Sequence, residues 1–221
     1  MPGVEPDPAA ETLVGGAPVS IGVLKAALSR APRLAAADGG ADTCLRHGLR
    51  PDRVVGDMDS ISAEARSALA AVTTHMPDQD STDLDKALRT SDAPLVLGCG
   101  FLGARMDHAL AALSTLARRG RPPGPRVVLL SETDCLCLLP PRASLPLRAG
   151  MRVSLWPMGP TTGTSIGLRW PIDGLRLDPA GRIATSNVAT GPVRILHSGG
   201  PLVLVLDADA LDAMLALDPR A

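Results

Sequence analysis

Carboxylate side chains in this chain recur directly after short apolar runs that are typical of β-strands. In an open α/β sheet the carboxyl ends of the strands form one edge, so segments far apart in sequence meet there. Carboxylates gathered at one edge repel each other by roughly 4 kcal/mol per pair at about 4 Å, and a bound cation offsets that repulsion. The pattern therefore predicts a site for a metal and a phosphate. The segments concerned are Asp38, 56–60, 78–83, 105–108 and Asp134.

The segment 56–60 carries two carboxylates, Asp57 and Asp59, two residues apart at a predicted strand end. Both can reach one Mg²⁺ directly or through water. The same Asp-x-Asp spacing also fits an Asx turn in which Ser60 or Ser62 caps the next helix. Asp38 adds a third carboxylate, and the two glycines that follow it let a phosphate approach the backbone.

Asp83 is predicted to lie just inside a helix that Ser81 or Thr82 caps, with Gln79 a short step upstream. An acidic residue in a first helical turn also complements the helix dipole, so this position fits a structural role as well as a ligand role.

A second helix start combines Arg105, a cation suited to phosphate, with the carboxylate of Asp107. His108 beside them fits an acid–base role or a purely structural one.

Two different patterns divide the chain. Strand-like and helix-like segments alternate up to about residue 140, which predicts a parallel sheet wrapped by helices, a Rossmann-like α/β domain at 11–140. The proline-rich segment 140–146 is predicted to be a linker. Short β-type runs separated by turn residues follow, which predicts an antiparallel β domain at 147–221 with a short helix at 210–217. Residues 1–10 are expected to be disordered.

Composition narrows the partners and the compartment. The net charge of −1 offers no broad basic face, which argues against nucleic acid or an anionic membrane as a partner. No apolar stretch reaches the roughly 20 residues of a spanning helix. The four cysteines follow no secretory leader, so we expect a cytoplasmic protein with buried thiols and without disulfides or zinc. The three aromatic residues leave a core of Leu, Val and Ala, and Trp170 is either core or a stacking surface.

Taken in order, these segments closely resemble the thiamine pyrophosphokinase (thiamine diphosphokinase) family. Each motif alone is modest, but the ordered set is specific and extends over nearly the whole chain. One departure is Ala104, where the family usually has glycine before Arg105; the added methyl group narrows the approach of a phosphate. The segments that carry the resemblance are 36–42, 51–61, 78–88, 103–108, 165–171 and 185–187.

The resemblance implies an enzyme that transfers the pyrophosphoryl group of ATP to the hydroxyl of thiamine, giving thiamine diphosphate and AMP. It implies a catalytic α/β domain that binds ATP and Mg²⁺, a C-terminal β-sandwich that binds thiamine, and a homodimer with sites at the interface. By position, the implied metal ligands are Asp57, Asp59 and Asp83; the acidic site is completed by Asp38 and Gln79; the phosphates and the metal network are held by Arg105 and Asp107; and the thiamine residues are Trp170, Ser186 and Asn187.

Physical chemistry agrees with that division of roles. Phosphoryl-type transfer requires in-line positioning and charge neutralisation rather than a covalent intermediate. Asp83 or Asp107 is the candidate general base. Thiamine carries a cationic ring, which an acidic edge and the face of Trp170 both attract. We expect Asp57→Asn or Asp59→Asn to abolish most activity and to leave the fold intact, because each removes a like charge.

Other classes of protein fit less well. A P-loop kinase is excluded, because neither Lys25 nor Lys86 lies in a Gly-x-x-x-x-Gly-Lys-Ser/Thr loop. A phosphatase with an aspartyl nucleophile would need a stabilising lysine, for which helical Lys86 is a poor candidate. A nucleotide-binding regulator without turnover would have lost carboxylates. The closest alternative is a pyrophosphokinase for another alcohol, such as a hydroxymethylpterin, and the motif around Trp170 and Asn187 favours thiamine.

Overall fold

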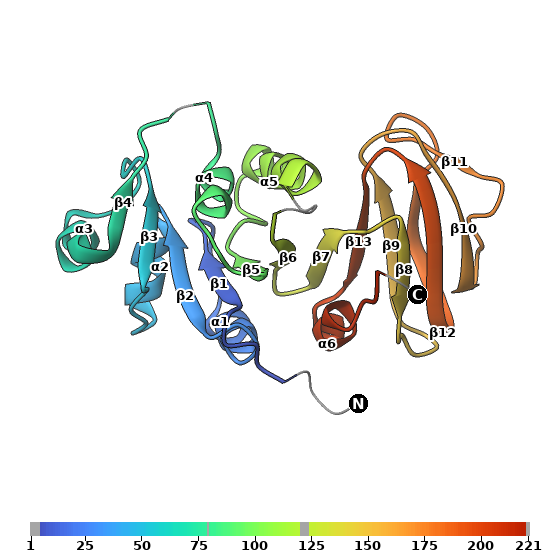
Figure 1. Ribbon diagram of the computed structural model, residues 1–221, viewed down its shortest axis with the longest axis horizontal. Coiled ribbons are helices and arrows are strands. Elements are labelled where there is room, and N and C mark those ends of the chain that lie inside the picture. The colour runs from blue at the N-terminus through green and yellow to red at the C-terminus, as the bar shows by residue number, and fades with distance from the viewer. Residues whose placement is uncertain (1–4, 79, 120–123, 220–221) are drawn as a thin grey trace. The chain divides into compact units, whose positions relative to one another are not determined.

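The chain forms a mixed α/β structure that divides into two compact units along the sequence (Figure 1). The computed structural model describes residues 5–78, 80–119 and 124–219. The two units meet in the sequence between Glu132 and Thr133, ahead of the segment 140–146 in which the sequence placed the division.

The first unit is built on a parallel sheet of strands in the order β4-β3-β2-β1-β5-β6. Apart from the edge strand β4, its strands are buried along nearly their whole length, as expected for a parallel sheet that is covered on both faces. In register, Leu13 of β1 lies between Ala35 of β2 and Gly98 of β5. The strands are β1 (Glu11–Val14), β2 (Arg33–Ala37), β3 (Arg53–Gly56), β4 (Thr73–His75), β5 (Leu95–Cys99) and β6 (Arg126–Leu130).

Strand order reverses beside β1. From β1 the chain runs outward through β2, β3 and β4, and then returns to the other side of β1 with β5 and β6. Ligands bind outside the carboxyl ends of strands at such a reversal. The backbones approach closely there: Gly100 has a φ of 75°, and a Cβ at this residue would lie 2.7 Å from the carbonyl oxygen of Gly15.

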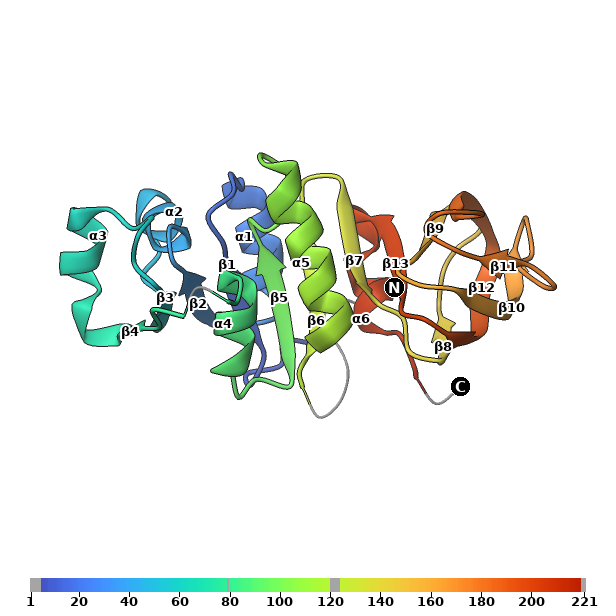
Figure 2. The same cartoon turned by 90° about the horizontal axis from the view of Figure 1, so that it is seen from above.

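Helices join these strands, and three of them begin at hydroxyl caps. Ser20, Ser62 and Thr82 accept hydrogen bonds from backbone N–H groups of α1, α3 and α4, which satisfies donors that a helix start leaves open. Helix α4 packs on β2 and β3, and α5 lies beside α4 (Figure 2). The helices are α1 (Ile21–Leu28), α2 (Gly40–Arg46), α3 (Ala63–Ala68), α4 (Asp83–Arg89) and α5 (Met106–Arg119), with a 3₁₀ turn at Ala70–Val72.

The second unit consists of two antiparallel sheets that share one long strand, β12. The first part of β12 pairs with β9, which continues to β13 and β7, and its later part pairs with β8 and with β10, which continues to β11. The elements are β7 (Asp134–Leu138), β8 (Arg142–Leu145), β9 (Arg152–Pro157), β10 (Thr161–Leu168), β11 (Arg176–Leu177), β12 (Ala184–Gly199), β13 (Leu202–Asp207), a 3₁₀ turn (Ala208–Ala210) and α6 (Leu211–Leu215).

Two predictions about this half of the chain were wrong. The proline-rich segment 140–146 is not a free linker, because residues 142–145 form β8 and pair with β12 from Val193 to Leu196. The β-type runs at 182–185 and 193–197 are not separate strands, because the single strand β12 begins at Ala184 and continues to Gly199.

The expected disorder of residues 1–10 is contradicted in its described part. The amide of Asp7 donates to the carbonyl of Arg30 at 3.1 Å, and Ala10 is fully buried ahead of β1. Residues 1–4 lie outside the described residues.

The core is made of Leu, Val and Ala, as predicted. The four cysteines, Cys44, Cys99, Cys135 and Cys137, are buried as thiols, which confirms the prediction of core thiols. Among the described residues, no helix has both the length and the apolar character that crossing a membrane would require.

Candidate active site

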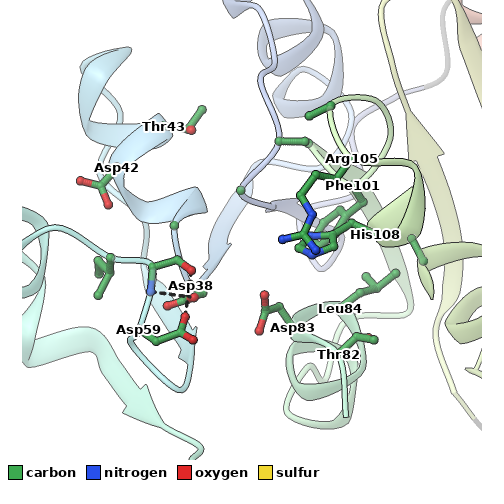
Figure 3. Close-up of a pocket in the computed structure, with 18 of the residues that line it drawn as sticks. Asp38, Asp42, Thr43, Asp59, Thr82, Asp83, Leu84, Phe101, Arg105 and His108 are labelled. Atoms are coloured by element: carbon green, nitrogen blue, oxygen red, sulfur yellow. Dashed lines mark hydrogen bonds between the residues drawn. The ribbon is translucent and has the colours of Figure 1, made fainter. Parts of the chain in front are cut away.

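A cavity of about 830 Å³ opens at the carboxyl ends of the strands in the first unit. Its size is in the range of small-molecule sites. The loops after β1, β2, β3 and β5 line it together with the starts of α4 and α5. Figure 3 shows the carboxylates of Asp38, Asp59 and Asp83 in this cavity, with the side chain of Arg105 across from Asp38 and Asp59.

Three carboxylates meet at the base of this cavity, as the sequence predicted. One oxygen from each of Asp38, Asp57 and Asp59 lies within 4.8 Å of the others. Asp38 is 2% exposed, and its Oδ1 has no hydrogen-bond partner among the described residues. A buried carboxylate oxygen without a partner is costly, and a hard cation with oxygen ligands removes that cost. The donor set therefore fits Mg²⁺.

The backbone that holds these carboxylates is strained. Asp38 has a φ of 46° and Met58, between the two other carboxylates, has a φ of 67°. Non-glycine residues in this region cost of order 1–3 kcal/mol each and cluster at functional sites. The guanidinium of Arg66 in α3 donates to the carbonyl of Met58 and so anchors the turn.

The turn interpretation of the Asp-x-Asp spacing is confirmed, and the same two carboxylates belong to the cluster with Asp38. The Oδ1 of Asp57 accepts from the amide of Asp59 at 3.4 Å, and Ser62 caps α3 by accepting from the amide of Ala65 at 3.1 Å. The side chain and the amide of Ser62 also bind Asp42, which lines the same cavity. The turn that caps α3 is therefore the same turn that presents the carboxylates of Asp57 and Asp59.

Lys86 is the main site residue that sequence reasoning missed. It is 1% exposed, and its Nζ lies 2.6 Å from Oδ2 of Asp57 and 3.8 Å from Oδ1 of Asp83. A lysine is almost never fully buried unless it is paired. The one signal in the sequence was the spacing of Lys86, which follows Asp83 by three residues in the same helix.

Electrostatics distinguishes the carboxylates from one another. Burial, reinforced by three neighbouring carboxylates, raises the pKa of Asp38 to about 6. Burial also raises the pKa of Asp83, although the charge of Lys86 opposes this. The hydrogen bond from Lys86 has the opposite effect on Asp57 and lowers its pKa. The environment therefore opposes the ionisation of Asp38 and Asp83 and favours that of Asp57.

Arg105 and Asp107 form a two-pronged ion pair at the start of α5. The Nε of Arg105 lies 3.1 Å from Oδ1 of Asp107, and its terminal nitrogen lies 2.6 Å from Oδ2. This hydrogen bonding lowers the pKa of Asp107. Arg105 and His108 line the cavity. Ala104 has a φ of 50°, a backbone conformation that favours glycine.

Several predicted residues lie elsewhere. Asp78 is paired with Arg89 at 2.9 Å, and Asp134 begins β7 in the second unit, where it is paired with Arg152 at 2.5 Å. Neither belongs to the carboxylate cluster. Gln79 lies outside the described residues.

The three residues expected to contact thiamine lie together in the second unit. Trp170 is 55% exposed, which contradicts the alternative that it is a core residue. The guanidinium of Arg169 lies 5.6 Å from the centre of its ring. Asn187 is 4% exposed and hydrogen-bonds the backbone of Trp170, and Ser186 has a φ of 59° beside it.

Fold and site together define an α/β protein that presents a carboxylate cluster, a buried lysine and an arginine in one cavity at a reversal of strand order. Comparison with known proteins agrees with that class. The family model described as thiamin pyrophosphokinase, catalytic domain, matches residues 24–129. Over these residues the chain belongs to the thiamine pyrophosphokinase family.

Individual relatives support this membership. The chain is 33% identical over 164 residues to thiamine pyrophosphokinase 1 of Oryza sativa subsp. japonica, covering 65% of this chain and 61% of the relative. It is 31% identical over 180 residues to thiamine pyrophosphokinase 2 of Arabidopsis thaliana, covering 72% and 66%. The match thus spans less than two thirds of the length of either relative.

Solved structures share the fold. Thiamin pyrophosphokinase from Candida albicans aligns with a TM-score of 0.77 at 15% identity, covering 90% of this chain and 89% of that one. Thiamine pyrophosphokinase from Bacillus subtilis aligns with a TM-score of 0.75 at 20% identity, covering 90% and 99%. The prediction of a mixed α/β fold is confirmed.

Proposed function

We propose that this protein transfers the pyrophosphoryl group of ATP to the hydroxyl of thiamine, giving thiamine diphosphate and AMP. The observation that carries the proposal is the cavity itself, which the carboxylate cluster with its buried member Asp38 lines together with Lys86 and Arg105. Phosphoryl-type transfer requires mainly positioning and charge neutralisation, and this set of side chains is suited to both. Membership of the thiamine pyrophosphokinase family supports the choice of ATP and thiamine.

Within this proposal, Asp57 and Asp59 hold Mg²⁺, with Asp38 and Asp83 completing the acidic site. Bound Mg²⁺ supplies positive charge to the phosphates. Arg105 binds the phosphates, because a planar guanidinium matches their geometry. Lys86 stands next to the carboxylates as a fixed cation, 2.6 Å from Asp57, and limits their mutual repulsion.

A carboxylate accepts the proton of the attacking hydroxyl. Asp83 is better suited than Asp107, because burial raises the pKa of Asp83 whereas Arg105 lowers that of Asp107. Asp83 also lines the cavity, and Asp107 is not among the described residues that do so. A higher pKa makes a carboxylate a stronger base.

The second unit binds thiamine in this proposal through the exposed indole of Trp170, and Ser186 and Asn187 support that part of the site. The aromatic face attracts the cationic ring of thiamine by roughly 0.5 to 2 kcal/mol. We further propose that the protein is cytoplasmic and acts as a homodimer with its sites at the dimer interface.

The experiment is a product assay on purified protein with ATP, Mg²⁺ and thiamine. AMP must appear in equal amount with thiamine diphosphate, and the same assay with a hydroxymethylpterin as acceptor must give no AMP. Formation of ADP, or no product, would overturn the proposal; faster turnover of the pterin would replace thiamine as the acceptor.

A further inference from the structure

Both polar atoms of the Asn187 carboxamide are hydrogen-bonded to backbone groups of this chain. Its Nδ2 donates to the carbonyl of Trp170 at 2.6 Å, and its Oδ1 accepts from the amide of Trp170 at 3.2 Å. The same Oδ1 accepts from the amide of Val188 at 2.8 Å. Asn187 is buried, whereas Trp170 is 55% exposed. The side chain thus holds both polar backbone groups of the residue that presents the indole.

This contact lies where the backbone pairing of two strands ends. Leu168 of β10 is still paired with Ala189 of β12, and the amide of Arg169 donates to the carbonyl of Val188 at 2.8 Å. The backbone of Asn187 is paired with Val153 of β9. At Trp170 the side chain of Asn187 therefore makes the hydrogen bonds that a paired backbone would otherwise make. A carboxamide has the donor and acceptor of a peptide group, so it extends the pairing by one residue.

The turn at Ser186 supports this placement. The strand shifts register between Ala184 and Asn187, and Ser186 adopts a φ of 59° within the shift. The amide of Ser186 donates to Oγ of Ser154 at 2.9 Å, which anchors the bulge to β9. A β-bulge redirects the side chain that follows it, and here that side chain is Asn187.

We propose that Asn187 is a positioning residue that fixes the backbone of Trp170, so that the indole is presented to a planar cationic ligand. It acts through Trp170 instead of binding that ligand itself. The identity of the ligand as thiamine rests on the proposed function. The orientation of the indole does not depend on the proposed function, because it is measured without any ligand.

The chemistry of substitution at position 187 distinguishes positioning from mere filling of space. Asn187→Asp keeps the size and the two acceptor contacts, but it places a carboxylate oxygen against the carbonyl of Trp170, where a donor is required. Asn187→Ala removes all three hydrogen bonds. Thr190→Ala, a change at an exposed residue of the same strand, is the matched control.

The first test uses fluorescence of the full-length chain in a Trp156→Phe background, which leaves Trp170 as the single tryptophan. Asn187→Asp and Asn187→Ala are expected to change the emission maximum and the acrylamide quenching of Trp170, and Thr190→Ala is expected to change neither. Unchanged emission and quenching in a folded Asn187→Asp protein would overturn the proposal, whether or not thiamine is the ligand.

The second test is a double-mutant cycle on the apparent KM for thiamine. Trp170→Ala is expected to raise this KM by about 2- to 30-fold with kcat nearly unchanged, which corresponds to the range of a cation–π contact. Asn187→Ala is expected to raise the KM within that range, and adding it to Trp170→Ala is expected to have no further effect. Fully additive effects would show direct contact with the ligand and overturn the proposal.

The outcomes separate this proposal from the proposed function. If wild-type protein releases no thiamine-dependent AMP, the proposed function fails while the fluorescence test still decides the role of Asn187. If Asn187→Ala does not fold, Asn187→Asp replaces it in the cycle.

Discussion

Nζ of Lys86 lies 2.6 Å from Oδ2 of Asp57, and the lysine side chain is only 2% exposed. The protein therefore carries one of its own cations inside the carboxylate cluster. A buried ion pair contributes little net stability when intact, but removal of one partner is costly because the remaining charge is left without compensation. The carboxylates of the cluster are thus not equivalent, since Asp57 has a protein partner for its charge.

This pairing changes the expectation for two neutral substitutions. Asp57→Asn is expected to destabilise the metal-free protein by about 1.5–3 kcal/mol, the range for hydrogen bonds to charged groups, because Lys86 loses its closest counter-charge. Asp59→Asn removes only a like charge and is expected to leave the midpoint of thermal unfolding unchanged or raised. Both are expected to lose most activity. Equal unfolding midpoints for the two variants would contradict the role given to Lys86.

Lys86→Met is expected to lower kcat roughly 10²- to 10³-fold, as does removal of a preorganised charge donor from other active sites. The substitution keeps the length of the side chain and removes the ammonium group. Steady-state kinetics at saturating Mg²⁺ and ATP measure the effect. Lys25→Met is the matched control, because Lys25 is the other lysine of the chain and lies exposed on α1. Equal kcat values for these two variants would exclude Lys86 from the reaction.

Asp38→Asn is expected to stabilise the metal-free protein at neutral pH. The pKa of Asp38 in the fold is about 6, above the ordinary value of 3.8 for an aspartate, so ionisation opposes folding. The wild-type protein therefore loses stability as pH rises from about 4 to 6, by up to about 3 kcal/mol, and the variant does not. Asparagine also tolerates the positive φ at this position.

Chemical unfolding between pH 4.5 and 8, in EDTA, measures this difference. The advantage of the variant is expected to be greatest at pH 8 and to shrink toward pH 4.5. Adding Mg²⁺ is expected to stabilise the wild-type protein more than Asp38→Asn, which keeps Asp57 and Asp59 but lacks the third carboxylate of the cluster. If the difference in stability between the wild-type protein and Asp38→Asn did not vary with pH, ionisation of Asp38 could not be its cause.

Arg66→Ala is expected to raise the Mg²⁺ concentration needed for half-maximal activity by roughly 10-fold, in line with groups that orient metal ligands. Arg66 touches the carbonyl of Met58 and so fixes the strained turn between Asp57 and Asp59. Arg66→Lys is expected to restore part of the loss. Glu64→Ala, in the same helix, serves as control. An unchanged Mg²⁺ dependence in Arg66→Ala would show that the turn from Asp57 to Asp59 keeps its conformation without Arg66.

Local patterns in the sequence were sufficient for much of the fold and part of the site. Apolar runs and capping residues predicted β2, β3 and the cap of α4 at Thr82, because these features depend on neighbours within one turn. The meeting of Asp38 with Asp57 and Asp59 followed from the general geometry of parallel sheets.

Contacts between distant segments were beyond these patterns. Lys86 meets Asp57 across 29 positions in sequence, so its burial could not be read from α4 alone. Two strands were predicted in place of β12, because residues such as Gly191 and Pro192 usually interrupt a strand. In the fold, register shifts at β-bulges let one strand serve two sheets.

The reactivity of the four buried thiols measures local opening of the folded structure. Cys44 and Cys99 belong to the first unit, and Cys135 and Cys137 belong to the second. Burial raises the pKa of Cys44, Cys99 and Cys135 to about 12, so alkylation of these thiols at neutral pH requires exposure to water. Pulsed alkylation followed by mass spectrometry would therefore record the opening of each unit separately, in the unmodified natural sequence.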